Sequence, residues 1–170
     1  MIPGDHYRIL NAIVNVLNLK NIIEIGTATG LSALAMKEGN KDTYIHTYDL
    51  IQWNKYPSGT HFTRDNMQNI NQVIGDLSQL DFFEKNFKIL DNADFIFVDG
   101  PKDGVFEYKM IDLFKKLSKK ESKYLFFDDI RFMNMIDLWV SISSPKIDLT
   151  SFGHWSGSGL VDISNGLHTE

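Results

Sequence analysis

The feature that most constrains the fold is a regular alternation of short apolar, β-branched runs with segments of helical spacing. Each of the first five runs is followed by a glycine or an acidic residue. This alternation is typical of parallel strands joined by helices, which cover both faces of the sheet. The predicted strands are residues 22–25, 43–50, 71–77, 94–100 and 124–128, then a hairpin of residues 146–152 and 158–164 joined through GHWSGSG. The predicted helices are residues 5–19, with Asp5 as N-cap, and residues 31–37, 60–70, 81–87, 103–118 and 131–143. We therefore expect an α/β fold: a doubly wound, mostly parallel seven-stranded sheet with a C-terminal antiparallel hairpin.

Composition narrows the class of protein. The 170 residues contain no repeat, linker or low-complexity segment, so a single domain over residues 1–170 is the simplest organisation. A net charge of −5 argues against broad attraction to nucleic acid. The absence of cysteine excludes disulfides, thiolate zinc sites and cysteine nucleophiles. The start MIPGDHYRIL does not resemble a signal peptide, and no stretch reaches the roughly 18 apolar residues that cross a membrane, so we expect a cytoplasmic protein.

Parallel sheets of this kind bind ligands beyond the carboxyl ends of their strands. After the first strand comes Gly26-Thr27-Ala28-Thr29-Gly30, and a helix is predicted from Leu31. Glycines at this spacing permit a tight turn and a close approach of a ligand, and the helix start offers free amide groups. The spacing is GxxxG, whereas a dinucleotide fingerprint reads GxGxxG. A plain strand-to-helix turn with no ligand stays open for this loop alone.

Acidic residues follow the next two strands. Asp49 lies 23 residues beyond Gly26, where doubly wound folds place an acid that accepts the hydroxyls of a ribose. Together with the glycine loop, it favours ligand binding over a simple turn. Asp76 belongs to a Gly-Asp pair that is common in turns and carries little information by itself.

The fourth and fifth strands end in charged residues. Asp99 and Lys102 are three residues apart at the sheet rim, where they could bind a cation and move a proton, or pair with each other at the surface. The adjacent Asp128 and Asp129 repel one another unless a cation or a donor compensates them. Hard oxygen ligands suit Mg²⁺, Ca²⁺ or Mn²⁺. The structural alternative is that Asp129 caps a helix starting near Arg131 while Asp128 pairs with that arginine.

These residues resemble a known family. The segment Glu24 to Gly30 with Ser32 is similar to motif I of class I S-adenosylmethionine-dependent methyltransferases, especially the caffeoyl-CoA and catechol O-methyltransferase branch. The segment DFIFVDGPKDG is similar to the family's "DxIFxDxxK" pattern. The family's Asp-Asn after strand five is Asp128-Asp129 here, as in the macrocin-type sugar O-methyltransferases. The resemblance covers roughly residues 5–143.

The resemblance implies a Rossmann-like methyltransferase fold and a role for each motif. The methionine part of S-adenosylmethionine would be held by the glycine loop and its neighbours, namely Glu24, Gly26, Thr27, Gly30 and Ser32. Asp49 would bind the ribose, and Asp76 would lie near the adenine amine. Asp99 would contribute both to the cofactor site and to catalysis. Together with Asp128 and Asp129 it would also form a metal site. Lys102 would act as a base if its pKa is lowered.

The implied reaction is methyl transfer to a hydroxyl of a small acceptor, aromatic or sugar-like, assisted by a divalent metal. The loop 52–61 and the hairpin tip 152–159 remain to shape the acceptor pocket, with Trp53, Tyr56, His154 and Trp155 as candidate contacts. The family's extra N-terminal helices have no counterpart before residue 5. Three alternatives follow for the acceptor site: it is open, it is completed by the partner subunit of a homo-oligomer, or it suits a large substrate. The alternatives are a metal-independent methyltransferase acting on N or O, a non-catalytic cofactor-binding subunit, and a nicotinamide-dependent dehydrogenase, against which the missing GxGxxG argues.

Overall fold

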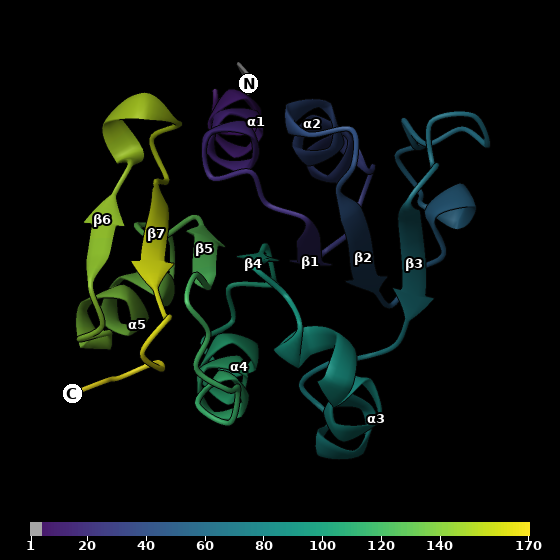
Figure 1. The fold of residues 1–170 in the computed structure, drawn as a ribbon. Helices are drawn as coiled ribbons and strands as arrows, with labels where there is room; N and C mark the ends of the chain where they lie inside the picture. Colours follow the sequence, from purple (N-terminus) through teal and green to yellow (C-terminus); the bar gives the residue numbers. More distant parts are fainter. Residues whose placement is uncertain (1–4) are drawn as a thin grey trace.

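The computed structural model describes residues 5–170, which form a seven-stranded sheet with helices on both faces (Figure 1). The strand order is β3-β2-β1-β4-β5-β7-β6. The strands are β1 (Asn21–Ile25), β2 (Tyr44–Asp49), β3 (Ile70–Ile74), β4 (Phe95–Val98), β5 (Tyr124–Asp128), β6 (Lys146–Asp148) and β7 (Ser158–Asp162). The helices are α1 (His6–Val16), α2 (Leu31–Gly39), α3 (Leu80–Asp91), α4 (Phe106–Phe114) and α5 (Met135–Ser141).

The first five strands are parallel, and β7 is antiparallel to both β5 and β6. The predicted doubly wound sheet with a C-terminal antiparallel hairpin is therefore confirmed. The chain reverses its direction of winding between β1 and β4, which lie side by side at the centre of the sheet. Ligands of doubly wound proteins bind at this switch point. No helix among residues 5–170 is both long and apolar enough to cross a membrane.

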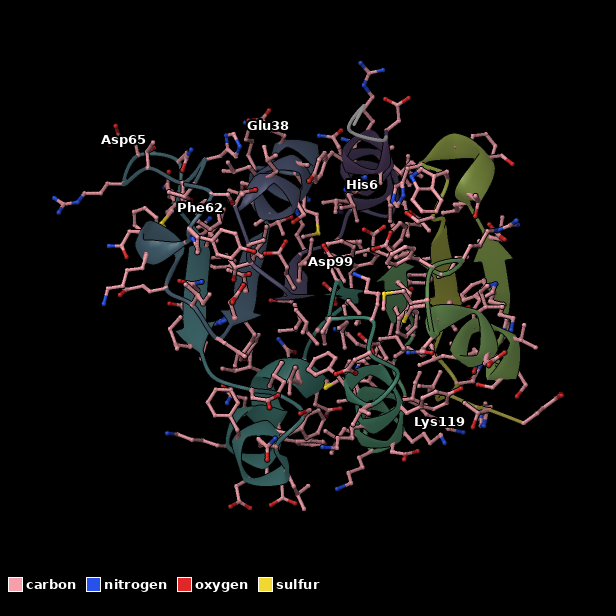
Figure 2. All side chains as sticks on the ribbon, turned by 180° about the vertical axis from the view of Figure 1, so that it is seen from behind. His6, Glu38, Phe62, Asp65, Asp99 and Lys119 are labelled. Carbon is pink, nitrogen blue, oxygen red and sulfur yellow. The ribbon has the colours of Figure 1, made fainter. Side chains whose placement is uncertain are left out.

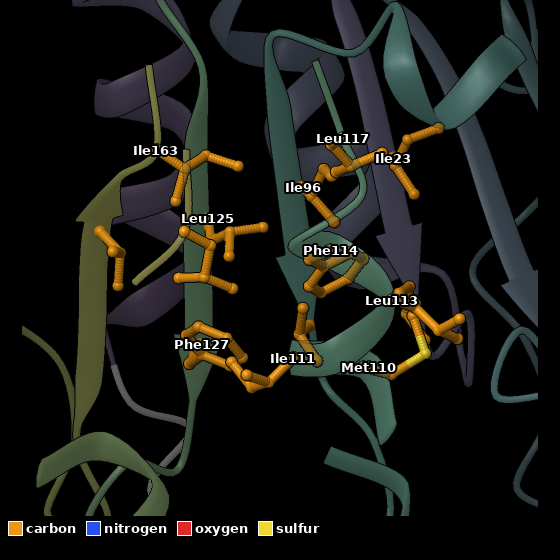
Figure 3. Packing of buried hydrophobic residues seen from close by; sticks show 14 of the residues in the cluster. Ile23, Ile96, Met110, Ile111, Leu113, Phe114, Leu117, Leu125, Phe127 and Ile163 are labelled. Atoms are coloured by element: carbon orange, nitrogen blue, oxygen red, sulfur yellow. The ribbon is translucent and has the colours of Figure 1, made fainter. Parts of the chain in front are cut away.

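The two faces of the sheet are filled by alternate residues of the same strands. In Figure 1, α1 and α2 lie on one side of the sheet, and α3, α4 and α5 lie on the other. On β4, Phe95 and Phe97 join the core under α1 and α2, whereas Ile96 and Val98 join the core on the opposite face. Figure 3 shows this second core, where Phe114 of α4 packs near Ile96. The period of two along each strand explains why the apolar runs are continuous: both faces are buried.

The predicted helix over residues 60–70 is wrong. Thr63 and Asn66 form reciprocal bonds between side chain and backbone, with Asn66 Oδ1 accepting from the Thr63 amide at 2.8 Å. Such bonds compete with helical pairing, because they satisfy the same backbone groups in a turn. The segment is instead held against the glycine loop, where the His61 amide donates to the Thr29 carbonyl oxygen at 2.8 Å.

Two helix starts also differ from the prediction. Helix α5 begins at Met135 rather than Arg131, because the backbone amides of Ile130 and Arg131 donate to carbonyl oxygens of Gly157 and Ser156. Asp5 stands at the N-cap position of α1, but its side chain makes no capping hydrogen bond. Its carbonyl oxygen accepts from the Arg8 amide at 2.9 Å instead.

Candidate functional site

A cavity of about 560 Å³ lies at the carboxyl ends of the parallel strands. Asp49 and Asp76 line it from the β2 and β3 side, and Asp99 lines it from β4. The sequence-predicted positions that meet in its wall are Gly26, Asp49, Asp76 and Asp99, together with the predicted acceptor contact Tyr56. Chain segments far apart in the sequence therefore converge on one space, as the carboxyl-end rule predicts.

The glycine loop is tightly packed against its neighbours. Gly26 has φ +102°, and a Cβ atom there would lie 2.2 Å from the backbone oxygen of Asp99. Gly30, at the start of α2, has φ +84°, and a Cβ atom would lie 2.8 Å from the ring of Phe62. Both positions need glycine because the left-handed conformation and the close approach each disfavour a side chain. The loop is thus fixed between β4 on one side and the segment after residue 60 on the other.

Asp49 and Asp76 organise the backbone around the cavity. Asp49 Oδ2 accepts a hydrogen bond from the Ala28 amide at 2.9 Å, and Asp49 Oδ1 accepts one from the Ile51 amide at 3.0 Å. Asp76 accepts from the Ser78 amide at 2.9 Å. Burial alone would raise the pKa of Asp76, but hydrogen bonds from Gln79 and Ser78 outweigh it and lower the pKa. Asp76 is therefore an anion in the cavity wall at neutral pH.

The side chains of Glu24, Thr27 and Ser32 are buried, and these residues are not part of the cavity lining. Glu24 is fully buried, and its carboxyl group accepts hydrogen bonds from Ser32 Oγ at 2.5 Å and from Thr47 Oγ1. Thr27 and Thr47 share a hydrogen bond of 2.7 Å. Burial raises the pKa of Glu24 to about 8, although the two hydroxyl groups lower it. These hydrogen bonds connect the glycine loop and the start of α2 to β1 and β2. The predicted contact of these side chains with a cofactor stays a prediction.

The second group of predicted residues forms a cluster beside the cavity. Asp99, Asp128 and Asp129 each offer a carboxylate oxygen, and the three oxygens lie within 4.8 Å of one another. Asp99 belongs both to this cluster and to the cavity wall. Figure 2 shows Asp99 near the centre of the molecule. His6 and Phe62 lie on one side of it in this view, and helices α3 and α4 lie on the other. Asp99 is therefore the point where the two parts of the site meet.

Lys102 lies inside the carboxylate cluster. Its ammonium group bonds to Asp99 Oδ1 and lies 3.3 Å from Asp129 Oδ2, and the residue is only 5% exposed. Asp99 and Lys102 do pair, as one alternative had it, but Lys102 is buried whereas the Asp99 side chain is 36% exposed. Burial opposes the charged form of Lys102, yet the neighbouring carboxylates outweigh it, so the pKa of Lys102 is raised. A cation bound to the same carboxylates would oppose this effect, so the role of Lys102 as a base stays a prediction.

The charges of the cluster fit a divalent cation. Three carboxylates and one ammonium group leave two negative charges when all four groups are ionised, and carboxylate oxygens are the ligands that Mg²⁺, Ca²⁺ and Mn²⁺ prefer. The structural alternative for Asp128 and Asp129 is wrong, because Arg131 pairs with Asp148 at 2.7 Å and α5 begins further on. The donor set thus suits the metal that the sequence motif implies.

Two histidines border this cluster: the sequence analysis named His154 only as a candidate acceptor contact, and it did not identify His6. His154 Nε2 lies 2.8 Å from Asp128 Oδ1, and His154 Nδ1 lies 2.6 Å from Ser156 Oγ. The ring of His6, on the first turn of α1, lies 4.7 Å from the ring of His154. The signal available for His154 was the hairpin itself: antiparallel pairing puts Asp128 opposite Ser158, so the turn before β7 returns to the end of β5. We found no sequence signal for His6.

The aromatic residues predicted for the acceptor pocket fall into different environments. Trp53 packs edge-on against Phe62 at 6.2 Å between ring centroids, as part of the core beside the glycine loop. Trp155 is 71% exposed and packs edge-on against the ring of Phe132 at 5.7 Å. Of the four candidates, Trp155 is thus the one most available to a ligand arriving at the cluster.

The fold is that of a Rossmann-like α/β protein with a cavity at the switch in strand order. The sequence profile of the O-methyltransferase family matches residues 1–130, and the chain belongs to this family. A search of curated protein sequences finds no match.

Solved structures of low sequence identity share the fold. A Staphylococcus aureus protein assigned as a caffeoyl-CoA O-methyltransferase is 14% identical, with a TM-score of 0.66, over 95% of this chain and 84% of that chain. The SAH-bound methyltransferase PaMTH1 of Podospora anserina is 18% identical, with a TM-score of 0.61, over 97% and 78%. The O-methyltransferase TomG of Streptomyces achromogenes, in complex with SAM, is 15% identical, with a TM-score of 0.61, over 100% and 82%.

Proposed function

We propose that this O-methyltransferase moves the methyl group of S-adenosylmethionine to a hydroxyl oxygen of a small aromatic or sugar-like acceptor, assisted by a divalent cation. The observation that carries the proposal is the double position of Asp99, whose side chain borders both the cavity and the carboxylate cluster. A donor in the cavity and an acceptor at the cluster would meet there. The complexes of PaMTH1 with SAH and of TomG with SAM support this choice of cofactor.

The cavity has the groups that an adenosyl cofactor needs. Asp49 and Asp76 supply carboxylate oxygens for ribose hydroxyls and an exocyclic amine, and Gly26 lets the glycine loop pack against the Asp99 backbone in the cavity wall. When bound, the sulfonium supplies an electrophilic methyl carbon: the carbon–sulfur bond breaks with its electron pair left on sulfur while a carbon–oxygen bond forms. The chain itself holds the two reactants in line, which accounts for much of the rate of such a transfer.

The charged cluster would prepare the acceptor. A divalent cation held by Asp99, Asp128 and Asp129 would supply positive charge that favours the ionised form of a hydroxyl group. Because the pKa of Lys102 is raised, we assign it the role of a fixed positive charge beside the acceptor oxygen. The hydroxyl proton then passes to water, since Lys102 and the cation already engage the Asp99 carboxylate.

One observation favours a second candidate, a methyltransferase without a metal. The ammonium group of Lys102 already pairs with Asp99 and Asp129, so part of the charge that a cation would neutralise is compensated within the chain. In that case Lys102 alone would stabilise the ionised acceptor.

Methyl transfer from labelled S-adenosylmethionine tests the proposal, with catechols and sugars as acceptors and with Mg²⁺, Mn²⁺ or EDTA. We expect transfer to a hydroxylated acceptor that EDTA suppresses and that Asp128→Ala abolishes. Transfer unaffected by both changes would favour the metal-independent candidate. Binding of S-adenosylhomocysteine should weaken at least about tenfold in Asp49→Ala and stay unchanged in the matched control Asp42→Ala, which pairs with Lys20 at the opposite end of β2. Equal binding by both variants would contradict the assignment of the cavity.

A further inference from the structure

Asp128 lies between two groups of potential metal ligands. On one side are the carboxylates of Asp99 and Asp129, and on the other are the imidazole rings of His6 and His154. A ring nitrogen of each histidine and a carboxylate oxygen of Asp128 lie within 4.8 Å of one another. Ligand atoms around a common ion are roughly 3–4 Å apart, given metal–ligand distances of about 2.0–2.2 Å. Only small side-chain shifts would therefore bring these three donors onto one ion.

The ring of His154 is held in a fixed orientation. Its Nδ1 atom pairs with Ser156 Oγ at 2.6 Å, which leaves Nε2 directed at Asp128 Oδ1, 2.8 Å away. Ser158 Oγ donates to the same carboxylate oxygen at 3.3 Å. Imidazole rings that bind metals are usually oriented by such a partner on the second nitrogen. The side chains of His154 and Asp128 are 13% and 7% exposed, so the pair is well shielded from water.

His6 supplies an independent observation. Among residues 5–170, its Nδ1 atom is the buried side-chain nitrogen or oxygen that has no hydrogen-bond partner. A buried polar atom without a partner is costly, and native proteins rarely keep one without a reason. This nitrogen belongs to a ring that packs edge-on against His154, beside a buried carboxylate. An ion held through Nδ1 of His6 would satisfy it.

The position of Lys102 separates this group from the carboxylate cluster. In the described part of the chain, Lys102 forms ion pairs with Asp99 and Asp129 but none with Asp128. The ammonium group therefore opposes a cation placed between Asp99 and Asp129 more than one placed on the histidine side of Asp128. Two imidazole nitrogens and one carboxylate are a donor set that suits first-row transition metals, whereas Mg²⁺ and Ca²⁺ prefer oxygen ligands.

We propose that His6, Asp128 and His154 form a binding site for a transition-metal dication that accepts imidazole nitrogen, with Co²⁺ and Mn²⁺ as its spectroscopic probes. The site shares Asp128 with the carboxylate cluster but takes its other ligands from His6 and His154, so it is an alternative position for the ion. It rests on the proposed function only for the role of the ion in methyl transfer. Metal binding itself is a property of the three side chains and needs no acceptor.

The test uses the whole chain and the metals alone. Pulsed electron paramagnetic resonance of bound Mn²⁺ should show coupling to imidazole ¹⁴N nuclei, and titration with Co²⁺ should give the visible absorption of a nitrogen-ligated ion. We expect His154→Ala and His6→Ala each to weaken the binding of Co²⁺ at least about tenfold and to reduce the nitrogen coupling. His61→Ala, a histidine outside the cluster, is the matched control and should change neither signal.

Two results would overturn the site: Co²⁺ bound without nitrogen ligation, or nitrogen coupling that is undiminished in both histidine variants. His154→Gln provides a second variant that keeps a polar side chain, and binding of S-adenosylhomocysteine or the far-ultraviolet circular dichroism spectrum verifies folding. The readouts separate the two proposals. If the bound metal shows nitrogen coupling but no methyl transfer occurs, the metal site is supported and the proposed function is contradicted. If an ion without nitrogen coupling supports methyl transfer, the function is supported and the metal site is contradicted.

Discussion

The Nζ atom of Lys102 lies 3.3 Å from Oδ2 of Asp129, and both residues have a left-handed backbone conformation, with φ +60° and +59°. Neither residue is a glycine, so each conformation is disfavoured locally and is held by its surroundings. The loops after β4 and β5 thus direct a lysine and an aspartate toward each other at the edge of the sheet. Strain of this kind is concentrated at functional sites, which agrees with the assignment of this cluster.

Replacing Lys102 tests how the cluster is neutralised. We expect Lys102→Met to abolish methyl transfer and to lower the free energy of unfolding by about 1–3 kcal/mol, because Asp99 and Asp129 lose their common partner. Added Mn²⁺ should restore part of this stability, since a dication can replace the lost positive charge. Urea unfolding with and without the metal measures both effects.

Lys115→Met is the matched control, because Lys115 pairs with Asp112 at the surface of α4 and is outside the cluster. Its stability should change little, as is usual for exposed ion pairs. If Lys102→Met were as stable as the control and indifferent to Mn²⁺, the electrostatic account of the cluster would be wrong.

Gly30 and Gly59 offer a matched pair for the glycine loop. Their φ angles are +84° and +85°, but a Cβ atom at Gly30 would lie 2.8 Å from the ring of Phe62, whereas one at Gly59 would have no neighbour within 4 Å. Gly59→Ala should therefore cost only the backbone strain, about 1–2 kcal/mol. Gly30→Ala should cost about 1–3 kcal/mol more and weaken the binding of S-adenosylhomocysteine.

Urea unfolding and calorimetric titration of both variants measure these differences. The double variant Gly30→Ala with Phe62→Leu should recover part of the lost stability, because the smaller side chain can make room for the new methyl group. Equal costs at Gly30 and Gly59 would show that contact with Phe62 does not constrain the loop.

Trp155 tests the acceptor side of the site. The residue is 71% exposed and stacks edge-on with Phe132, so its removal should disturb neither the fold nor the cofactor cavity. We expect Trp155→Ala to raise the KM for an aromatic acceptor several-fold while the affinity for S-adenosylhomocysteine stays unchanged. Steady-state kinetics measures the first quantity and calorimetry the second. Val16→Ala, 78% exposed on α1, is the control for removing an exposed apolar side chain. An unchanged KM would remove Trp155 from the acceptor site.

The sequence predicted the sheet and its ligand edge because both depend on local patterns. The runs around Ile23 and Ile96 are buried on both faces and therefore continuous, and the residues that follow them must lie at the same edge of a parallel sheet. The predicted helix over residues 60–70 is wrong for a physical reason that the spacing of residues does not reveal. The side chains of Thr63 and Asn66 form hydrogen bonds with the backbone, and these bonds replace the helical ones.

The histidine side of the cluster could not be predicted in the same way. His6 and His154 lie near opposite ends of the chain and meet only because α1 and the turn before β7 both return to the end of β5. The raised pKa of Lys102 is equally non-local, because it depends on how closely Asp99 and Asp129 approach the ammonium group. Contacts between separate elements decide these properties, and the spacing of residues in the sequence does not encode them.

The buried Glu24 makes stability depend on pH in a direction unusual for an acid. Its pKa of about 8 in the folded chain exceeds the ordinary value of 4.5, because burial disfavours the charged form. Between these values the folded protein holds a proton that the unfolded chain releases. The contribution of Glu24 is therefore fully present below about pH 4.5 and is lost as the pH rises through 8, a change on the order of a few kcal/mol.

Glu24→Gln should remove this part of the pH dependence, because the amide stays neutral. Like a protonated carboxyl group, it offers one oxygen that accepts a hydrogen bond and one group that donates, so it can still bond to Ser32 and Thr47. Urea unfolding of both proteins between pH 5 and pH 8.5 measures the slopes. The natural chain should lose stability across this range more steeply than the variant, whereas the exposed Glu38→Gln on α2 should follow the natural chain. Parallel slopes for the natural chain and Glu24→Gln would mean that Glu24 is ionised in the folded protein. The hydroxyl groups of Ser32 and Thr47 would then outweigh burial, and the buried Glu24 would carry a full negative charge.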